Sequence, residues 1–351
     1  MSTARALILT MAVSLGPASG PVSAEAVFTN VRQLSDGGPY GTHGTLSPGG
    51  ELVAFESVRG AGVPTSVVLT REIETAAEQQ ASPEQGRASA PVFHPTEDRL
   101  LFASTHDAEA PRSAIVPLAP WTRSFDPEFE VYSAKADGGG LVRLTKNDVY
   151  DGEPAYSTDG ARIAFSSARD PAEEGAPARN VGQELDLYVM GWDGSGAKRL
   201  TEEPGYEGGA AFSPDGKRIA FHRFGLHTGR SEIWTVRPDG TGARQVTRLG
   251  ATSWGPAYHP SGSYLVFASN AGSGSGFSLY LVDPKGEREP ALVTERAGFD
   301  AFPSFSADGK TLVWTSNRTR SGTAQIFRAD WGHEAARKVL APAKPADGEG
   351  D

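Results

Sequence analysis

The sequence contains no cysteine and no long apolar run, and both absences limit what the protein can be. With no Cys among the 351 residues, disulfides, thiol catalysis, thiolate metal sites and a lipid-modified N-terminal cysteine are excluded. The apolar stretch near the start, Ala6 to Val13, is too short to span a bilayer, and no later run approaches about 20 apolar residues. Helical periodicity is also missing along the chain. The sequence therefore predicts a fold of short elements held by its apolar core alone.

Motifs for catalysis are missing as well. A serine hydrolase needs Gly-x-Ser-x-Gly on a strand-to-helix turn, and the run from Gly272 to Gly276 has its glycines out of that register. No glycine-rich phosphate or dinucleotide loop stands between a strand and a helix. The seven histidines show no zinc spacing, although His222 and His227 flank one loop. These absences favour a protein that is not an enzyme.

The first 24 residues resemble a secretion signal. Arg5 precedes the apolar stretch, and Val22-Ser23-Ala24 offers a cleavage site of small residues before Glu25. A retained N-terminal anchor is the alternative. We expect a periplasmic or secreted protein without a membrane span.

The charge is acidic, and this argues against nucleic acid as a partner. The full chain has a net charge of −10, and loss of Arg5 with the signal leaves 32 basic and 43 acidic side chains, or −11. Binding to phosphate backbones requires clustered Lys and Arg. The charge mainly favours solubility.

One short motif recurs six times and determines the fold prediction. Clear copies are Phe212-Ser213-Pro214-Asp215-Gly216 and Phe305-Ser306-Ala307-Asp308-Gly309. The second residue of each copy stands at position 47, 94, 157, 213, 259 or 306, so successive copies are 47, 63, 56, 46 and 47 residues apart. A period of 46 or 47 residues, lengthened twice by insertions, is typical of propeller blades.

Each repeat carries the turn and strand chemistry of a four-stranded blade. The Asp-Gly pair forms a tight turn, because glycine adopts the positive φ that hairpin turns demand. Apolar strands follow, such as 218–221 and 232–236, and the last strand ends in Leu-Thr or Val-Thr, as at Leu200-Thr201. The sequence predicts an all-β protein, a six-bladed β-propeller of four-stranded blades.

The motif resembles the PD40, or WD40-like, repeat of the TolB-like six-bladed β-propeller family. The resemblance runs from about Val31 to Leu340 and implies a periplasmic scaffold that binds proteins or small ligands. TolB itself carries an α/β domain ahead of its propeller. Only Glu25 to Asn30 precede the first repeat-like strand here, so we expect no counterpart of that domain, and the resemblance transfers the fold better than the function.

The domain boundaries follow from the repeats. We predict a signal peptide at 1–24, the propeller at 25–341 and a disordered tail at 342–351, which is rich in Pro, Ala and acids. Two segments are candidates for the last strand of blade six: Val31 to Ser35, and Arg337 to Leu340. We favour the N-terminal segment, because it clasps the two ends of the chain and covers a sheet edge.

Propeller topology divides the loops between two faces. The turns within the motif and the turns between third and fourth strands share one face, which we call the turn face. The blade connections and both long insertions lie on the opposite face, which we call the connection face. The insertions cover about 106–127 and 168–183, and we expect a binding surface in the first, at Arg112, Trp121, Arg123 and Phe125.

A row of polar residues marks the same face. Six positions before each marker stand Gly41, Ala88, Asp151, Glu207, Ser253 and Asp300, and two residues further on stand His43 in the first repeat and Glu153 in the third. We expect these side chains to gather around the mouth of the central channel. The acids could cap strand ends, bind a polar ligand or hold a cation such as Ca²⁺; Trp254 could be a stacking platform or inter-blade packing.

Two functions from different classes remain open. The first is a monomeric, non-enzymatic scaffold that needs no cofactor and binds a protein, a peptide or a small polar ligand on the connection face. The second is a metal-dependent hydrolase or lactonase that uses His43 with Asp151, Glu207 and Asp300. An enzyme requires these side chains to converge on one point, whereas a scaffold does not.

Overall fold

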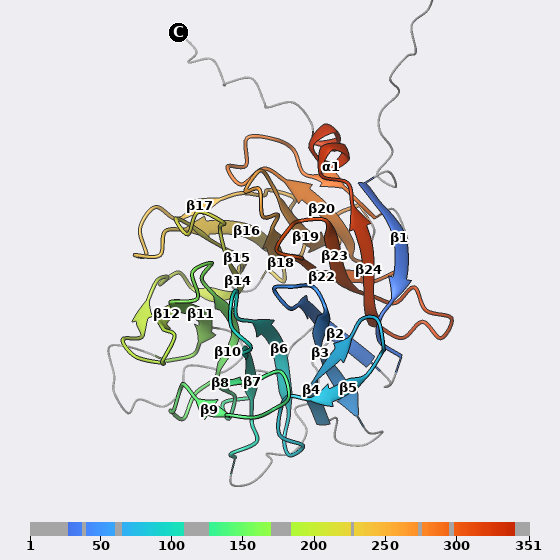
Figure 1. The fold of residues 1–351 in the computed structure, drawn as a ribbon. Helices are drawn as coiled ribbons and strands as arrows, with labels where there is room; N and C mark the ends of the chain where they lie inside the picture. The colour runs from blue at the N-terminus through green and yellow to red at the C-terminus, as the bar shows by residue number, and fades with distance from the viewer. Residues whose placement is uncertain are drawn as a thin grey trace, which may run out of the picture.

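The computed structural model describes residues 27–36, 40–59, 65–108, 126–169, 184–225, 228–272, 276–294 and 298–340. These residues form six antiparallel sheets of four strands each, arranged in a ring. Figure 1 shows the ring running from blue through green and yellow to red, so that the first and last strands meet. The predicted all-β class and six-bladed propeller are confirmed.

The strands of each blade follow one another along the chain, from the ring axis outward. Blades 1 and 2 contain β2 (Tyr40–Leu46), β3 (Leu52–Arg59), β4 (Thr65–Glu72) and β5 (Glu78–Gln80), then β6 (Ala88–Phe93), β7 (Leu100–Ser104), β8 (Glu130–Ala134) and β9 (Val142–Arg143). Blades 3 and 4 contain β10 (Asp151–Tyr156), β11 (Arg162–Ser167), β12 (Asp186–Gly191) and β13 (Lys198–Arg199), then β14 (Gly205–Phe212), β15 (Ile219–Gly225), β16 (Ser231–Val236) and β17 (Arg244–Gln245). Blade 5 contains β18 (Ser253–Tyr258), β19 (Leu265–Ser269), β20 (Ser278–Val282) and β21 (Ala291–Leu292).

Blade 6 is assembled from both ends of the chain. Its inner strands are β22 (Asp300–Phe305), β23 (Thr311–Ser316) and β24 (Gln325–Trp331), and its outermost strand is β1 (Phe28–Gln33), which pairs antiparallel with β24. The preference for closure by the N-terminal strand is therefore confirmed. Most of the competing segment belongs instead to α1 (His333–Val339). The sequence did not predict this helix, because seven residues are too few for a helical period to be recognised.

The core repeats with the motif. Eight residues after each marker stands an aromatic side chain of the second strand, at most 2% exposed: Phe55, Phe102, Phe165, Phe221, Phe267 and Trp314. Burying such a side chain contributes about 1.5–3 kcal/mol. Because all six lie at equivalent positions, each blade packs against the next with the same aromatic layer.

A second repeated feature holds the outer strands. The Ser or Thr that follows each fourth strand accepts a hydrogen bond from a third-strand backbone N–H, at 2.8 or 2.9 Å. The acceptors are Ser35, Ser82, Thr145, Thr201, Thr247 and Thr294. Short outer strands leave such N–H groups without a ladder partner, so the hydroxyl removes the cost of burying an unsatisfied donor. Ser35 fills this role in blade 6, which agrees with β1 as its fourth strand.

Histidine replaces serine in two of the six motif turns. Nδ1 of His94 accepts the Glu97 N–H at 3.0 Å, and Nδ1 of His259 accepts the Ser261 N–H at 3.1 Å. The serine of the other motifs accepts a backbone N–H in the same way, as Ser213 does from Arg218 at 2.9 Å. Both histidines therefore serve the turn.

Candidate functional site

The inner strands share one backbone irregularity, and it positions the candidate site. The pairing of each first strand with its second strand shifts register once, between positions 42 and 45 in blade 1 and at the equivalent place in the other five. At this bulge every blade has one residue with φ between 51° and 60°. We call these six residues the bulge row: His43, Ala90, Glu153, Gly209, Gly255 and Phe302. A bulge changes the direction in which the neighbouring side chains point. The residue before the bulge and the residue at the bulge therefore face different surroundings.

The three acids before the bulge lie inside their own blades. Asp151 and Glu207 are 0% exposed and Asp300 is 3% exposed. Each forms an ion pair with an arginine of its own second strand or of the residues just after it: Arg169, Arg223 and Arg318, respectively. The three carboxylates therefore do not converge, and each neutralises one arginine.

The arginine partners carry a sequence signal that the motif analysis missed. In blades 3 and 6 the arginine stands two residues after a serine that ends the second strand, in Ser167-Ala168-Arg169 and Ser316-Asn317-Arg318. In blade 4 the arginine itself stands opposite the acid, because Glu207 pairs with Arg223 in the ladder. Acid and arginine occur together in three blades, which is the pattern of a structural pair.

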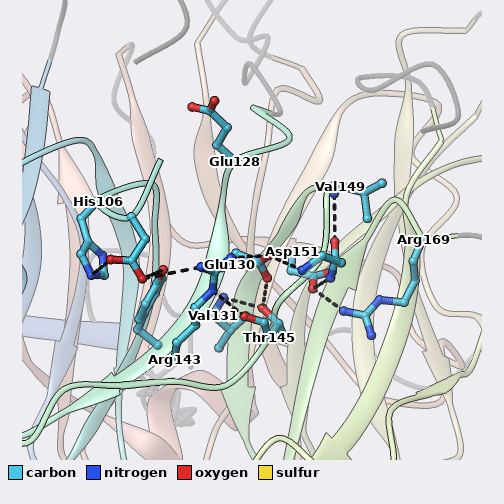
Figure 2. Close-up of polar contacts among 12 residues, drawn as sticks. His106, Glu128, Glu130, Val131, Arg143, Thr145, Val149, Asp151 and Arg169 are labelled. Carbon is cyan, nitrogen blue, oxygen red and sulfur yellow. Dashed lines mark hydrogen bonds and ion pairs between the residues drawn. The ribbon is translucent and has the colours of Figure 1, made fainter. Parts of the chain in front are cut away.

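The network around Asp151 also joins two blades (Figure 2). Asn147 donates to Asp151 through its side chain at 2.6 Å and to Glu130 of blade 2 through its backbone N–H, also at 2.6 Å. Glu130 also accepts from Arg143 at 2.9 Å and from Thr145. Burial raises the pKa of both carboxyl groups, and the neighbouring arginine opposes it in each. Figure 2 shows Arg169 at one edge of the network and Glu128 pointing away from it. This cluster fastens blade 2 to blade 3.

In the described part of the chain, no three carboxylate, imidazole or thiol groups lie close enough together to hold a metal ion. The alternative of a cation site built on Asp151, Glu207 and Asp300 therefore has no support in the geometry of the described residues. Asp300 instead accepts hydrogen bonds from Arg318 at 2.8 and 3.0 Å and from Nε1 of buried Trp314 at 3.1 Å.

The bulge row, by contrast, brings residues from different blades together. Glu153 of blade 3 accepts hydrogen bonds from the Tyr206 hydroxyl at 2.8 Å and from the Gly209 N–H at 2.8 Å, both of blade 4. His43 of blade 1 packs against Phe302 of blade 6 with tilted rings, whose centres are 3.7 Å apart. Contacts therefore pass from blade to blade around the mouth of the ring on the connection face.

Two positions of the bulge row are glycine. A Cβ on Gly209 would lie 2.8 Å from Nδ1 of His222, and one on Gly255 would lie 3.6 Å from the Phe302 ring. Both glycines have positive φ, a conformation that costs glycine nothing. A side chain at either position would meet the neighbouring ring, so glycine leaves room for His222 and Phe302.

Aromatic rings of blades 4, 5 and 6 form a continuous arc. Tyr206 stacks on Phe224 at 5.4 Å, Phe224 meets Trp254 at 6.4 Å, and Trp254 stacks on Phe302 at 6.0 Å. Phe299 lies 6.3 Å from Phe302. We call these five partly exposed residues the aromatic arc. Trp254, predicted as a stacking platform or as inter-blade packing, stacks on buried Phe277 at 4.7 Å; its role as a platform stays a prediction.

His43 lies at the end of this arc with an acid beside it. Its Nδ1 is 3.4 Å from a carboxylate oxygen of Glu56 and 3.1 Å from the Thr42 hydroxyl. The side chains of His43 and Glu56 are each 16% exposed. His43 was predicted as a site residue from the sequence and Glu56 was not. Glu56 stands on the second strand opposite Thr42.

The remaining predicted residues fall elsewhere. Arg112, Trp121, Arg123 and Phe125, expected on the first insertion, lie outside the described residues, and so does His227. Among the described residues, no helix is long and apolar enough to cross a membrane.

Comparisons with known proteins agree with this architecture. No family model matches the chain. A TolB homolog of Chlorobium luteolum is 30% identical over 128 residues, which are 27% of this chain and 29% of that protein. An uncharacterized peptidase, YuxL of Bacillus subtilis, is 26% identical over 201 residues, or 57% of this chain and 27% of the relative. The chain thus spans less than a third of the length of these two relatives.

Solved structures share the fold at low identity. TolB from Acinetobacter baumannii superimposes with a TM-score of 0.55 at 16% identity, over 80% of this chain and 64% of that one. A gluconolactonase from Xanthomonas campestris superimposes with a TM-score of 0.59 at 14% identity, over 88% and 91%. The protein is a six-bladed β-propeller, and its fold is similar to that of the TolB structures. The same fold carries binding proteins and enzymes, so the function has to be argued from the site.

Proposed function

We propose that this protein is an exported, non-enzymatic binding propeller that works as a monomer in the periplasm or outside the cell. It holds a protein or peptide segment on the connection face, against the aromatic arc. The observation that carries the proposal is the arc itself, with five partly exposed rings fixed by mutual contact around the mouth of the ring.

The chemistry of the arc suits a peptide. Aromatic side chains held rigidly contribute most of the binding energy at protein interfaces, because little side-chain entropy remains to be lost. The Glu153 carboxylate and the His43–Glu56 pair lie at the two ends of the arc and offer polar contacts. An extended segment with apolar side chains and a basic group would match this order of rings and carboxylates.

The likeness to TolB supports a binding role in the cell envelope, and the predicted signal at 1–24 supports export. The three buried acids support the same reading, because each is held by an arginine and is not available for catalysis.

Photocrosslinking tests the proposal in the cell. A photoreactive phenylalanine analogue at Phe299 should give a discrete crosslinked product, and Trp254→Ala should abolish it. Trp192 is the matched control, because it is a 61% exposed aromatic in the β12–β13 turn on the turn face. An analogue at Trp192 should give no such product. Equal crosslinking at both positions would contradict a site on the connection face.

A second candidate is an enzyme, favoured by the His43–Glu56 pair and by the likeness to a gluconolactonase. A histidine beside a carboxylate could act as a general base. Turnover of a sugar lactone that is lost in both His43→Gln and Glu56→Gln would support this candidate. Turnover that survives both changes would remove it.

A further inference from the structure

A groove lies on the turn face. It measures about 920 Å³ and lies between the motif turns of blades 4 and 5, the β20–β21 turn and α1. Figure 1 shows α1 beside β20 at the rim of the ring. The helix extends this rim, because Ala336 and Leu340 are buried against the core of blades 5 and 6.

The lining of the groove is basic although the protein is acidic. Six cationic side chains line it against four carboxylates: Arg218, Arg244, Lys285, Arg288, Arg337 and Lys338 against Asp215, Asp283, Glu287 and Glu334. The whole chain has a net charge of −10. A local excess of positive charge on such a protein requires an explanation.

Two of the carboxylates are committed to turns. Asp215 accepts the Ser213 hydroxyl at 2.7 Å and the Lys217 N–H at 3.1 Å, and these hydrogen bonds hold its pKa below the usual value. Asp283 accepts two backbone N–H groups of its own turn, from Lys285 at 3.0 Å and from Arg288 at 2.7 Å. Both acids therefore stabilise the turns that present the cations.

The arginines of blade 4 lack a carboxylate. Arg218 donates to Oγ1 of Thr235 at 3.0 Å and to backbone carbonyl oxygens, and Arg244 donates to the Pro284 carbonyl at 3.2 Å. Within the described residues, neither arginine forms an ion pair, and neither do Lys285, Arg288 and Lys338 of the same groove. These cations are held in place but are not neutralised.

Arg244 is also close enough to Arg218 to disfavour the charge of Arg218. Burial lowers the pKa of Arg218, and Arg244 and Arg237 lower it further, which shows like charges gathered at one place. Tyr258 lies between these cations and the blade, and its hydroxyl is buried without a hydrogen-bond partner in the described part of the chain. Burial raises the pKa of Tyr258, so the hydroxyl stays protonated and available as a donor.

We propose that this groove binds a small polyanion that carries two or more carboxylate or phosphate groups. Its volume lies within the range of small-molecule sites, about 300–1,000 Å³. Guanidinium groups bind the planar oxygen pairs of both anions with two parallel hydrogen bonds. The Tyr258 hydroxyl supplies a neutral donor beside them. The site is independent of the aromatic arc, because the two lie on opposite faces of the ring.

Isothermal titration calorimetry at constant ionic strength tests the proposal, with citrate as the carboxylate probe and pyrophosphate as the phosphate probe. Saturable binding of at least one probe is expected, and the probe that binds identifies the class of anion. The double variant Arg244→Gln, Arg288→Gln should lose about tenfold or more in affinity, because two charged contacts are removed.

Two controls separate a site from a general charge effect. The double variant Lys310→Gln, Arg320→Gln removes the same charge from exposed positions of blade 6 that lie outside the groove, and it should bind like the wild type. Tyr258→Phe should weaken binding several-fold without lowering the midpoint of thermal unfolding, since it removes a hydroxyl that has no partner. Failure of both probes to saturate, or equal losses in the two double variants, would overturn the proposal.

Discussion

Replacement of Asp300 by alanine should destabilise the protein strongly, although the residue lies close to the candidate site. The change removes the two carboxylate oxygens that accept from the Arg318 guanidinium, at 2.8 and 3.0 Å, and the acceptor of the Trp314 indole N–H, at 3.1 Å. Trp314 is fully buried and the Arg318 side chain is 14% exposed. Removing one partner of a buried ion pair costs about 3–5 kcal/mol, because the remaining charge has no compensation.

Urea unfolding followed by tryptophan fluorescence measures this loss, and a double-mutant cycle isolates the pair. Arg318→Ala should restore part of the stability in the Asp300→Ala background, because the uncompensated charge is then gone. Asp308→Ala is the matched control: it is the exposed turn aspartate of the same blade and should cost about 1 kcal/mol or less. A loss below about 1 kcal/mol for Asp300→Ala, or strict additivity with Arg318→Ala, would refute the structural assignment of this acid.

Two further predictions concern buried polar groups. Burial raises the pKa of Glu207 from 4.5 to about 7. The folded state therefore binds a proton at this carboxylate more tightly than the unfolded state does. As a result, the free energy of unfolding should fall as pH rises from 4.5 to 7. The fall should be at most about 3 kcal/mol, and urea unfolding at several pH values between 4.5 and 7 should show it. If the free energy of unfolding of Glu207→Gln falls with pH as steeply as that of the wild type, the prediction is contradicted. Thr294→Val leaves the buried Leu279 N–H without its acceptor at 2.9 Å and should cost about 1–3 kcal/mol; the control Thr241→Val, at an exposed turn, should cost less in the same assay.

The fold could be predicted because its signals are local and repeated. Asp-Gly turns, short apolar strands and a spacing of 46 or 47 residues each point to a blade, and six copies leave one architecture. The closure of the ring followed from the same reasoning, since Val31 to Ser35 match the ending of a fourth strand. Among the described elements, α1 was not predicted, because its seven residues follow the last repeat and carry no pattern of their own.

The roles of the row residues could not be predicted from spacing alone. The alignment found the correct register, since His43 and Glu153 both occupy the bulge row. The expectation that Asp151 lies beside Glu153 at the channel mouth was wrong, because the bulge breaks the alternation of side chains along the strand. Residues two positions apart therefore face different surroundings. His43, Glu153 and Phe302 adopt positive φ without being glycine, and no residue type in the sequence marks that conformation.

The clasp between β1 and β24 has a consequence for how the chain folds. Asn30 bonds Asp330 across 300 positions of sequence, so blade 6 cannot form until the last part of the chain has left the ribosome. Contacts of such sequence separation slow folding, because a very long loop must close before they contribute. Among the described strands, β1 is therefore one of the last to pair, and a chain truncated before β24 retains an open ring.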